Sequence, residues 1–376
     1  MAQIGLHALN RTTLHRQGLL ERFRGPVPEV VGRLAGLQAQ HADQPYIALW
    51  SRRADHTVAD LEQALGDRTV VKATLLRTTL HLVPAADYRA YDVVSAGPRV
   101  ATWRPTARRA GVDLAALGRE VRAFCSEPRT VAEIEAHLTG LHPDVDLAAA
   151  APGGVRNAWF RPATATGGLV HVPPSGMWRS HGKPRYLDAT LWLGDADREP
   201  PDLATALVTV LRRYLTAYGP ASLDDVVRWA GQRRLPPVRK ALESLGDELV
   251  RHTGPGGTEL FDLAGLEVVD DVPAPPRFLS RWDSLIIGYA ARERILPPEH
   301  TPAVAKKNGD FLPTFLLDGF VAGLWSVDRA GDTAVLRLQP FATPSRQQRA
   351  ALEEEAERLV RFVEPDAARH EVAWAD

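Results

Sequence analysis

Thr57-Val-Ala-Asp60-Leu61-Glu-Gln-Ala-Leu65 is the stretch that decides the fold, because the chain repeats its pattern twice. The second copy is Thr130-Val-Ala-Glu133-Ile134-Glu-Ala-His-Leu138, and a looser third copy is Ser222-Leu-Asp-Asp225-Val226-Val-Arg-Trp-Ala230. Each copy begins with a hydroxyl residue that is followed three positions later by a carboxylate, the pattern of a reciprocal cap at a helix N-terminus. The repeat predicts three equivalent helices and an internally repeated architecture.

A further helical stretch and then β-rich residues with Gly or Pro turns follow each copy. In the first, residues 73–83 have the pattern of a strand, which Pro84 stops. In the second, residues 154–160 lead to a hairpin over residues 169–179, and in the third a helix at 237–245 precedes a hairpin over 249–261. This order predicts three tandem winged-helix units, which place a helix in the DNA major groove and a hairpin near the backbone. Winged helices also serve as protein–protein modules, so that use stays open.

The C-terminal part has a different character. Val272-Pro-Ala-Pro-Pro276 is the predicted linker, and Asp318-Gly319 between apolar runs is typical of a hairpin. With the strand pattern at 334–338 it predicts a small sheet, followed by an acidic amphipathic helix over 346–363. We therefore expect an α+β chain with winged-helix units at 1–110, 111–200 and 201–271, and a β-rich element with a terminal helix at 272–376.

Composition places few limits on function but several on location. The 376 residues are 45% hydrophobic and 24% charged, as in an ordinary globular protein. No secretory leader is visible, and no run approaches the roughly 18 apolar residues of a membrane span. The one cysteine, Cys125, excludes an intramolecular disulfide and a cysteine-cluster zinc site, and we expect it to be buried in a helix. These features predict a cytoplasmic protein.

The net charge of −1 conceals an asymmetry. Residues 1–110 hold 15 Lys and Arg against 9 Asp and Glu, a balance of +6, so the remainder carries −7. A basic N-terminal part can face DNA phosphates, although a solvated surface explains the imbalance equally well. Nucleotide-binding glycine loops, His-Glu-x-x-His and cysteine pairs are absent, and the 12 histidines have no metal-gathering spacing. We therefore expect no metal and no cofactor.

Gln38-Ala-Gln40 is the candidate site. Gly36 before it and Pro45 after it indicate that a helix ends there, and in an extended segment the two amides point to the same side. Uncharged amides can hold a water or a sugar oxygen, but they cannot serve as a general base of matched pKa. Taken alone, such a triplet is more typical of surface polar residues.

Together these stretches resemble the AlkZ-like winged-helix DNA glycosylases, also called the AlkZ/YcaQ family. The resemblance rests on residues 36–40, on 76–84, on 172–178 with 191–194, and on 282–288 with Asp318-Gly319, so it covers essentially the full length. It implies a C-shaped monomer with a DNA channel in its concavity and no obligatory protein partner. It also implies that Gln38 and Gln40 are the catalytic Gln-x-Gln signature, with Ala39 as a small central residue.

What the resemblance implies about activity fits two amides. We expect a monofunctional DNA glycosylase that hydrolyses the N-glycosidic bond of bulky N7-alkylguanines, unhooks DNA interstrand crosslinks, or both, in several relatives as self-resistance to a genotoxic natural product. Because such a guanine is already cationic, the enzyme mainly stabilises an oxocarbenium-like sugar and delivers water to its C1′. The alternative is a non-enzymatic winged-helix DNA-binding or transcription-regulatory protein, which would usually be a symmetric dimer.

Candidate DNA contacts come from cations near the expected wings. Arg77 and His81, four apart on one expected strand, share a face and are predicted to contact phosphate or lesion, although a structural role for His81 is equally consistent. The second expected wing interleaves cations with aromatic residues, which favours contact with the DNA backbone. The predicted DNA-binding residues are Arg77, His81, Arg156 on the second recognition-like helix, Trp178, Arg179, Lys183 and Arg185.

Overall fold

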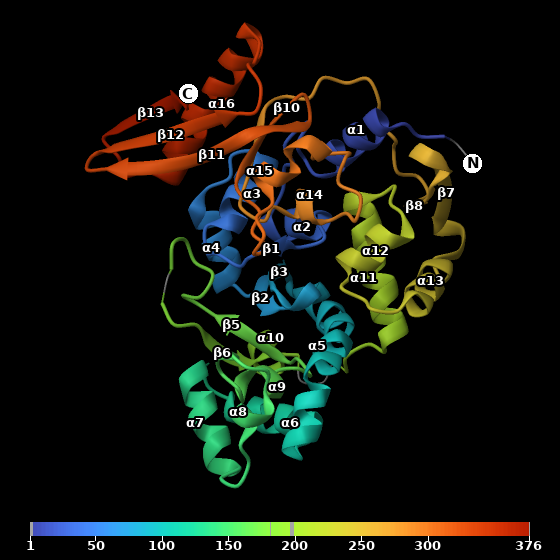
Figure 1. Cartoon of the computed structure of the whole chain (residues 1–376), viewed down its shortest axis with the longest axis vertical. Helices are drawn as coiled ribbons and strands as arrows, with labels where there is room; N and C mark the ends of the chain where they lie inside the picture. The colour runs from blue at the N-terminus through green and yellow to red at the C-terminus, as the bar shows by residue number, and fades with distance from the viewer. Residues whose placement is uncertain (1–2, 181, 196–198, 376) are drawn as a thin grey trace.

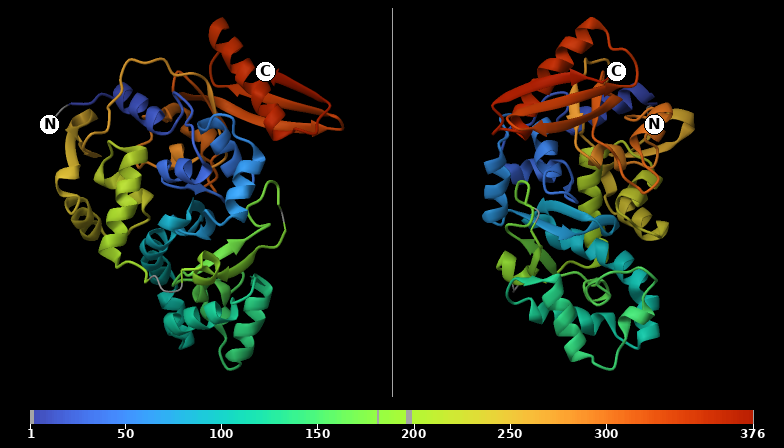
Figure 2. Two further views of the ribbon diagram at one scale, coloured as in Figure 1. Left: turned by 180° about the vertical axis from the view of Figure 1, so that it is seen from behind. Right: turned by 60° about the vertical axis from the view of Figure 1, so that its left-hand side comes forward.

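The computed structural model describes residues 3–180, 182–195 and 199–375. Three successive units of helices and β-hairpins are followed by a β-rich element with a long helix (Figure 1). The second unit and the C-terminal sheet lie at opposite ends of the molecule, with the first unit between them (Figure 2). The predicted α+β class is confirmed, whereas the division into winged-helix units and their residue boundaries stay a prediction.

The first unit contains the Gln-x-Gln segment. Its elements are α2 (Val27–Arg33), β1 (Leu37–Gln38), α3 (Gln44–Arg52), α4 (Val58–Gly66), β2 (Val70–Thr74), η1 (Leu76–Thr78), β3 (Leu80–Pro84), η2 (Ala85–Asp87) and α5 (Tyr88–Ala110). The single strand predicted over residues 73–83 is wrong. Arg77 and Thr78 have positive φ angles of 56° and 60°, which turn the chain in η1 and make β2 and β3 a hairpin.

The second unit departs further from expectation. Its elements are α6 (Leu114–Phe124), β4 (Arg129–Thr130), α7 (Val131–Leu141), α8 (Leu147–Ala150), α9 (Phe160–Ala163), β5 (Leu169–Val172), β6 (Arg185–Asp188) and α10 (Ala189–Leu193). The helix predicted to carry Arg156 is wrong, because positive φ angles at Gly154 (81°) and Asn157 (58°) interrupt helical geometry and only the short α9 follows. The hairpin partner of β5 is β6 and not residues 177–179, because Gly176 (φ 99°) and Arg179 (φ 52°) turn the chain.

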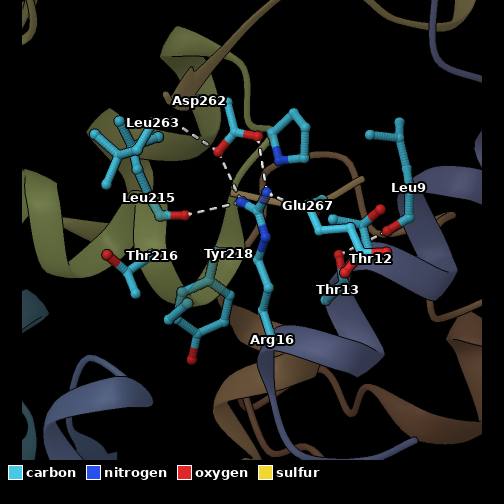
Figure 3. A network of polar contacts seen from close by, with 12 residues as sticks. Leu9, Thr12, Thr13, Arg16, Leu215, Thr216, Tyr218, Asp262, Leu263 and Glu267 are labelled. Carbon is cyan, nitrogen blue, oxygen red and sulfur yellow. Dashed lines mark hydrogen bonds and ion pairs between the residues drawn. The ribbon is translucent and has the colours of Figure 1, made fainter. Parts of the chain in front are cut away.

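The third unit matches its prediction. It comprises α11 (Leu203–Tyr218), α12 (Leu223–Trp229), α13 (Leu235–Glu243), η3 (Gly246–Glu248), β7 (Leu249–Thr253), η4 (Pro255–Gly257) and β8 (Glu259–Leu263). The N-terminal helix α1 (Leu6–Arg16) docks on this unit through Arg16, whose Nη1 and Nη2 donate to Asp262 Oδ1 and Oδ2 at 2.7 and 2.9 Å (Figure 3). Both side chains are buried, so α1 is held by a two-point ion pair.

The C-terminal element is built around a five-stranded sheet in the order β13-β12-β11-β10-β9. Its elements are β9 (Arg277–Leu279), α14 (Ser284–Ile287), η5 (Pro298–His300), α15 (Thr301–Val304), β10 (Thr314–Leu317), β11 (Phe320–Ala330), β12 (Thr333–Pro340), α16 (Arg346–Val363) and β13 (Arg369–Trp374). Asp318 (φ 46°) and Gly319 (φ 81°) form the predicted hairpin turn between β10 and β11. The predicted terminal helix is confirmed as α16, but β13, which pairs in parallel with β12, was not predicted.

Local signals placed the helix starts correctly. Reciprocal caps are present at all three repeated positions, pairing Thr57 with Asp60, Thr130 with Glu133, and Ser222 with Asp225. Each cap satisfies backbone N–H groups that a helix N-terminus leaves without a partner. Cys125 is buried directly after α6, as expected of a small apolar residue.

The first two units share one sheet, in the order β1-β3-β2-β5-β6-β4. The pairing of Lys72 in β2 with His171 in β5 joins the two hairpins. A shared hydrophobic core then joins the first unit, which includes α5, to the third unit, which includes α11. Its members include Val71, Tyr91, Tyr214 and Trp229. The units are therefore packed against one another rather than strung on linkers. Among the described helices, none has the length and apolar character that a membrane crossing requires.

Candidate functional site

The Gln-x-Gln segment enters the sheet directly after a helix. α2 ends at Arg33, and positive φ angles at Ala35 (56°) and Gly36 (86°) reverse the chain. A Cβ at Gly36 would lie 3.0 Å from the carbonyl oxygen of Leu82, so the close approach to β3 requires glycine. The expected helix end is thereby confirmed, and Gln38 lies in β1, paired with His81 in β3.

The two glutamines have different surroundings. Gln38 is half-buried, and its Oε1 is buried without a hydrogen-bond partner among the described residues. Gln40 is exposed, and its Oε1 accepts a hydrogen bond from the Leu80 backbone N–H at 3.3 Å. The Nε2 group of Gln40 lies on the opposite side of the amide from this contact. A buried acceptor without a donor is costly in a folded protein, and such atoms call for a ligand or a water. Gln38 therefore has a buried acceptor oxygen that no described residue pairs, and Gln40 has two N–H donors on Nε2 that a ligand can use.

Ala39 explains why the central residue is small and apolar. It is 1% exposed and belongs to the core of the first unit, and its N–H donates to the Leu80 carbonyl at 2.8 Å. With Ala39 pointing into the core, the glutamines on either side extend to the opposite face of the segment. The prediction that both amides share one side agrees with this alternation.

His81 is a neutral imidazole rather than a base. Its Nδ1 lies 3.0 Å from the Thr79 carbonyl oxygen, which can only accept, so Nδ1 carries the proton. Burial, and then the positive charge of Arg77, lower the pKa of His81 to about 3. A group with so low a pKa cannot accept a proton efficiently near neutral pH. His81 is 3% exposed and lies across the strands from Gln38, so the structural role left open in the sequence suits it.

Arg77 does not share a strand with His81, and that expectation is wrong. It lies in the η1 turn, where its Nη1 donates to the carbonyl oxygen of Trp229 at 2.5 Å and its Nη2 lies 3.5 Å from His81 Nε2. Gly231 lets the end of α12 approach this turn, because a Cβ there would lie 2.8 Å from the Arg77 backbone nitrogen. Arg77 therefore connects His81, which is paired with Gln38 in the sheet, with Trp229 of the third unit.

Sequence reasoning missed two arginines beside Arg77. Burial and the charge of Arg228 lower the pKa of Arg77 to about 10, and the same two causes lower the pKa of Arg292. Arg292 Nε is buried and has no hydrogen-bond partner among the described residues, while its guanidinium lies 5.0 Å from the centre of the Phe311 ring. No motif marks Arg228 or Arg292 in the sequence, because the fold alone brings residues 77, 228 and 292 together. Because the charge of Arg228 disfavours the charged forms of both Arg77 and Arg292, an anion bound beside them would be stabilised.

Two residues of the predicted second wing face the protein. The Trp178 backbone N–H donates to Glu62 Oε1 at 3.1 Å, and the Trp178 ring packs on Tyr46 and Phe362 with ring centroids 5.2 and 5.7 Å apart. Arg179 donates from Nη2 to the Val363 carbonyl at 2.6 Å and also pairs with Glu364. The expectation that both lie on a projecting hairpin strand is wrong, because the turn at Gly176 folds them onto α16.

Three other predicted DNA contacts remain on the surface. Lys183 and Arg185 are exposed, and Arg185 begins β6. Arg156 is exposed in a turn, where its carbonyl accepts from Arg161 Nε at 3.2 Å. Their contact with DNA stays a prediction.

Three buried histidines predict a loss of stability in acid. Burial is the first cause that lowers the pKa of His56 to about 4 and the pKa values of His81 and His171 to about 3, with Arg53, Arg77 and Lys72 adding positive charge. The unfolded chain takes up these protons near pH 6.5, so it binds more protons than the folded chain between pH 6.5 and about 4. Stability therefore falls as pH falls through this window, by up to about 1.4 kcal/mol per pH unit for each histidine.

Urea unfolding at pH 7, 6 and 5 measures this effect. His171→Leu is expected to reduce the dependence of the unfolding free energy on pH, because one of the protons is no longer taken up on unfolding. An unfolding free energy that stays constant over this range in the wild type would contradict the assignment.

The fold and the amide pair together define a class of protein. Successive units of helices and hairpins pack around a sheet whose edge strand carries Gln38, and the uncharged amides there cannot serve as general acids or bases. The family model described as DNA glycosylase AlkZ-like matches residues 31–362, and the chain belongs to this family of DNA glycosylases.

Two comparisons find a similarity to a DNA glycosylase of Streptomyces sahachiroi over nearly the whole length of the chain. An interstrand DNA cross-link repair glycosylase is 27% identical over 374 residues, with 93% of this chain and 94% of that protein covered. The structure of DNA glycosylase AlkZ superposes with a TM-score of 0.82 at 25% identity and covers 99% of this chain and 100% of that one. Both comparisons favour the enzyme over the transcription-regulatory alternative.

Proposed function

We propose that the chain hydrolyses the N-glycosidic bond of N7-alkylguanines and unhooks interstrand crosslinks made through such guanines. The similar interstrand DNA cross-link repair glycosylase supports this substrate class. The observation that carries the proposal is the buried Oε1 of Gln38, which has no hydrogen-bond partner in the described part of the chain, beside the exposed amide of Gln40. We further propose that the enzyme acts as a monomer in the cytoplasm, since three unlike units in one chain can surround a duplex without a symmetric partner. Self-resistance of a producing organism stays a prediction.

The two amides have different roles in hydrolysis. The Gln38 oxygen accepts a hydrogen bond from the attacking water and lies where positive charge develops on the sugar, so its dipole stabilises the transition state more than the ground state. The Gln40 Nε2 group donates to a sugar or phosphate oxygen and fixes the nucleotide, because its Oε1 is already held by the Leu80 N–H. The cationic guanine leaves as a neutral base, so no protein acid is required, and the proton that the attacking water loses passes to solvent.

The register of the sheet supports hydrolysis by water rather than by the amine of Lys72. Gln38, His81 and Ala73 lie opposite one another and share a face, whereas Lys72 lies opposite Leu82 and Leu37 on the other face. Lys72 is therefore directed away from the glutamines and cannot form a Schiff base with the sugar. This supports a monofunctional glycosylase.

The cluster of Arg77, Arg228 and Arg292 is proposed to hold a backbone phosphate next to the lesion. Arg77 reaches both His81 behind Gln38 and the end of α12, so a phosphate there would fix the strand relative to the amides. Arg228 is exposed and able to meet DNA directly. A phosphate held by these arginines would contact both the first unit, through Arg77, and the third unit, through Arg228.

The phosphate site predicts a change in the salt dependence of DNA binding. Arg228→Ala and Arg292→Ala are each expected to reduce the slope of log affinity against log salt concentration by about 1 on an unmodified duplex, because one phosphate contact releases about one counterion. Fluorescence anisotropy at several salt concentrations measures the slope. Arg212→Ala is the matched control, because Arg212 is exposed and already paired with Glu248. Unchanged slopes in both cluster variants would remove the arginines from the DNA site.

Incubation with a duplex that carries one interstrand crosslink tests the function. The expected result is separation of the two strands on a denaturing gel, with an unmodified duplex left intact. A protein that bound the unmodified duplex by sequence and left the crosslink in place would be a regulator and not a glycosylase.

A further inference from the structure

A cavity of about 560 Å³ opens beside the Gln-x-Gln segment. It lies between the start of α3, the loop that carries Arg179, and strands β11 and β12 of the C-terminal sheet. His41, the residue after Gln40, forms part of its wall. The volume is in the range that holds a drug-sized organic group. The wall of the cavity therefore begins one residue along the chain from Gln40.

Apolar side chains supply much of the wall. They come from α3 and from the C-terminal element, and include Ile47, Leu312, Leu324, Trp325 and Val327. Trp325 is 7% exposed and its indole N–H donates to the Leu279 carbonyl at 3.0 Å, so this part of the wall is rigid. An apolar group that enters the cavity is removed from water, which favours its binding.

Gln44 places one hydrogen-bond donor in this wall. The side chain is 2% exposed, and its Oε1 accepts from the His41 backbone N–H at 3.0 Å. That contact fixes the orientation of the amide, because an N–H group can pair only with the oxygen. Gln44 Nε2 is buried and has no hydrogen-bond partner among the described residues. A buried donor without an acceptor is costly, and an acceptor on a ligand would remove the cost.

The charged residues of the wall do not make an anion site. Arg281 Nε donates to Asp310 at 2.7 Å, Arg337 Nε donates to Asp328 at 2.6 Å, and Arg179 pairs with Glu364. Each guanidinium thus already has a carboxylate within hydrogen-bond distance. Asp43 adds one further carboxylate to the wall itself. A phosphate would meet these carboxylates, so an uncharged occupant is favoured over a DNA backbone group.

We propose that this cavity receives the substituent on N7 of the alkylated guanine. It selects uncharged, mainly apolar substituents that carry a hydrogen-bond acceptor for Gln44. The inference rests on the proposed glycosylase activity at Gln38 and Gln40. His41 stacks on Trp282 with ring centroids 5.3 Å apart, and Trp282 is itself held by a hydrogen bond to the Gly309 carbonyl at 3.0 Å. This stacking holds the His41 ring in place in the wall of the cavity, where a flat substituent can lie against it.

Three single-lesion duplexes test the proposal, carrying N7-methylguanine, N7-benzylguanine or N7-phenacylguanine. The methyl group is too small to reach the cavity, the benzyl group is apolar, and the phenacyl group adds a carbonyl acceptor. Val327→Trp narrows the cavity and is expected to lower kcat/KM at least tenfold for the benzyl and phenacyl lesions, while release of N7-methylguanine stays within about twofold. Gln44→Met is expected to lower kcat/KM roughly tenfold for the phenacyl lesion alone, because one hydrogen bond is lost.

Release of N7-methylguanine also reports whether each variant is folded. Leu191→Trp, on an exposed residue outside the cavity, is the control and is expected to behave as the wild type. Equal effects on all three lesions, or no effect on any, would overturn the inference. If Val327→Trp does not fold, the difference between phenacyl and benzyl lesions in Gln44→Met decides alone. A wild-type enzyme that releases none of the three bases refutes the proposed function, and the inference falls with it.

Discussion

Gln38→Ala is expected to lower the rate of base release about 100- to 1000-fold, the usual cost of removing one preorganised dipole from a reaction centre. The Gln38 oxygen is buried, has no partner among the described residues, and lies in a strand whose position is fixed by pairing with β3. A fixed acceptor needs little reorganisation when positive charge develops on the sugar, so its loss acts on the transition state. Single-turnover release of N7-methylguanine measures the change.

The affinity of Gln38→Ala for lesion-bearing DNA is expected to stay within a fewfold of the wild type. Gln38 is half-buried and uncharged, so it contributes little to the electrostatic attraction that dominates binding. Gln40→Ala is expected to lower both the rate and the affinity, since the exposed amide contacts the nucleotide. Full activity of both variants would remove the glutamines from the mechanism.

Asp283→Ala is expected to lower the free energy of unfolding by about 3–5 kcal/mol, because it leaves a buried cation without its partner. Arg52 at the end of α3 donates from Nη2 and Nη1 to Asp283 Oδ1 and Oδ2 at 2.6 and 3.0 Å, and each side chain is 1% exposed. Asp283 also accepts from the Leu285 N–H at 2.9 Å, which caps α14. Urea unfolding near pH 7 measures the loss.

An exposed ion pair provides the comparison for Asp283. Asp328→Ala removes a carboxylate that pairs with Arg337 at 2.6 Å, where both side chains are more than half exposed, and stability is expected to change little. If Asp283→Ala were as stable as Asp328→Ala, the buried pair would not hold α3 to the C-terminal element. Because Trp282 stacks on His41, a loosened Asp283 is also expected to disturb the amide site.

Short-range signals in the sequence predicted the local structure well. Ser222 and Asp225 mark a helix start because their hydrogen bonds close within four residues, and Asp318-Gly319 marks a turn because few other pairs adopt two positive φ angles. The end of α2 and the extended Gln-x-Gln segment followed from Gly36 and Pro45 in the same way. These features need no information from distant parts of the chain.

Features that depend on distant contacts were not predictable. The pairing of Lys72 with His171, which makes one sheet of two units, and the parallel pairing of β12 with β13 join segments that have no shared local signal. Aromatic and cationic residues in sequence do not reveal whether they face solvent, and Trp178 packs instead on α16.

The candidate site was likewise predictable only in part from the sequence. Gln38 and Gln40 could be selected from the sequence, first as a polar triplet and then through the family resemblance. Two features depend instead on packing between distant segments: Gln38 Oε1 has no partner among the residues that the structure describes, and Arg228 lies near both Arg77 and Arg292. The tight turn at Arg77 likewise became visible only from its backbone angles.

The central claim is that two neutral amides direct water to the sugar of a cationic guanine nucleotide. The products of one turnover on a duplex with a single N7-methylguanine test it most directly. The account predicts free 7-methylguanine and an uncut strand with an abasic site, with no adduct trapped by borohydride. Base release no faster than spontaneous depurination, or a trapped covalent adduct between protein and DNA, would contradict it.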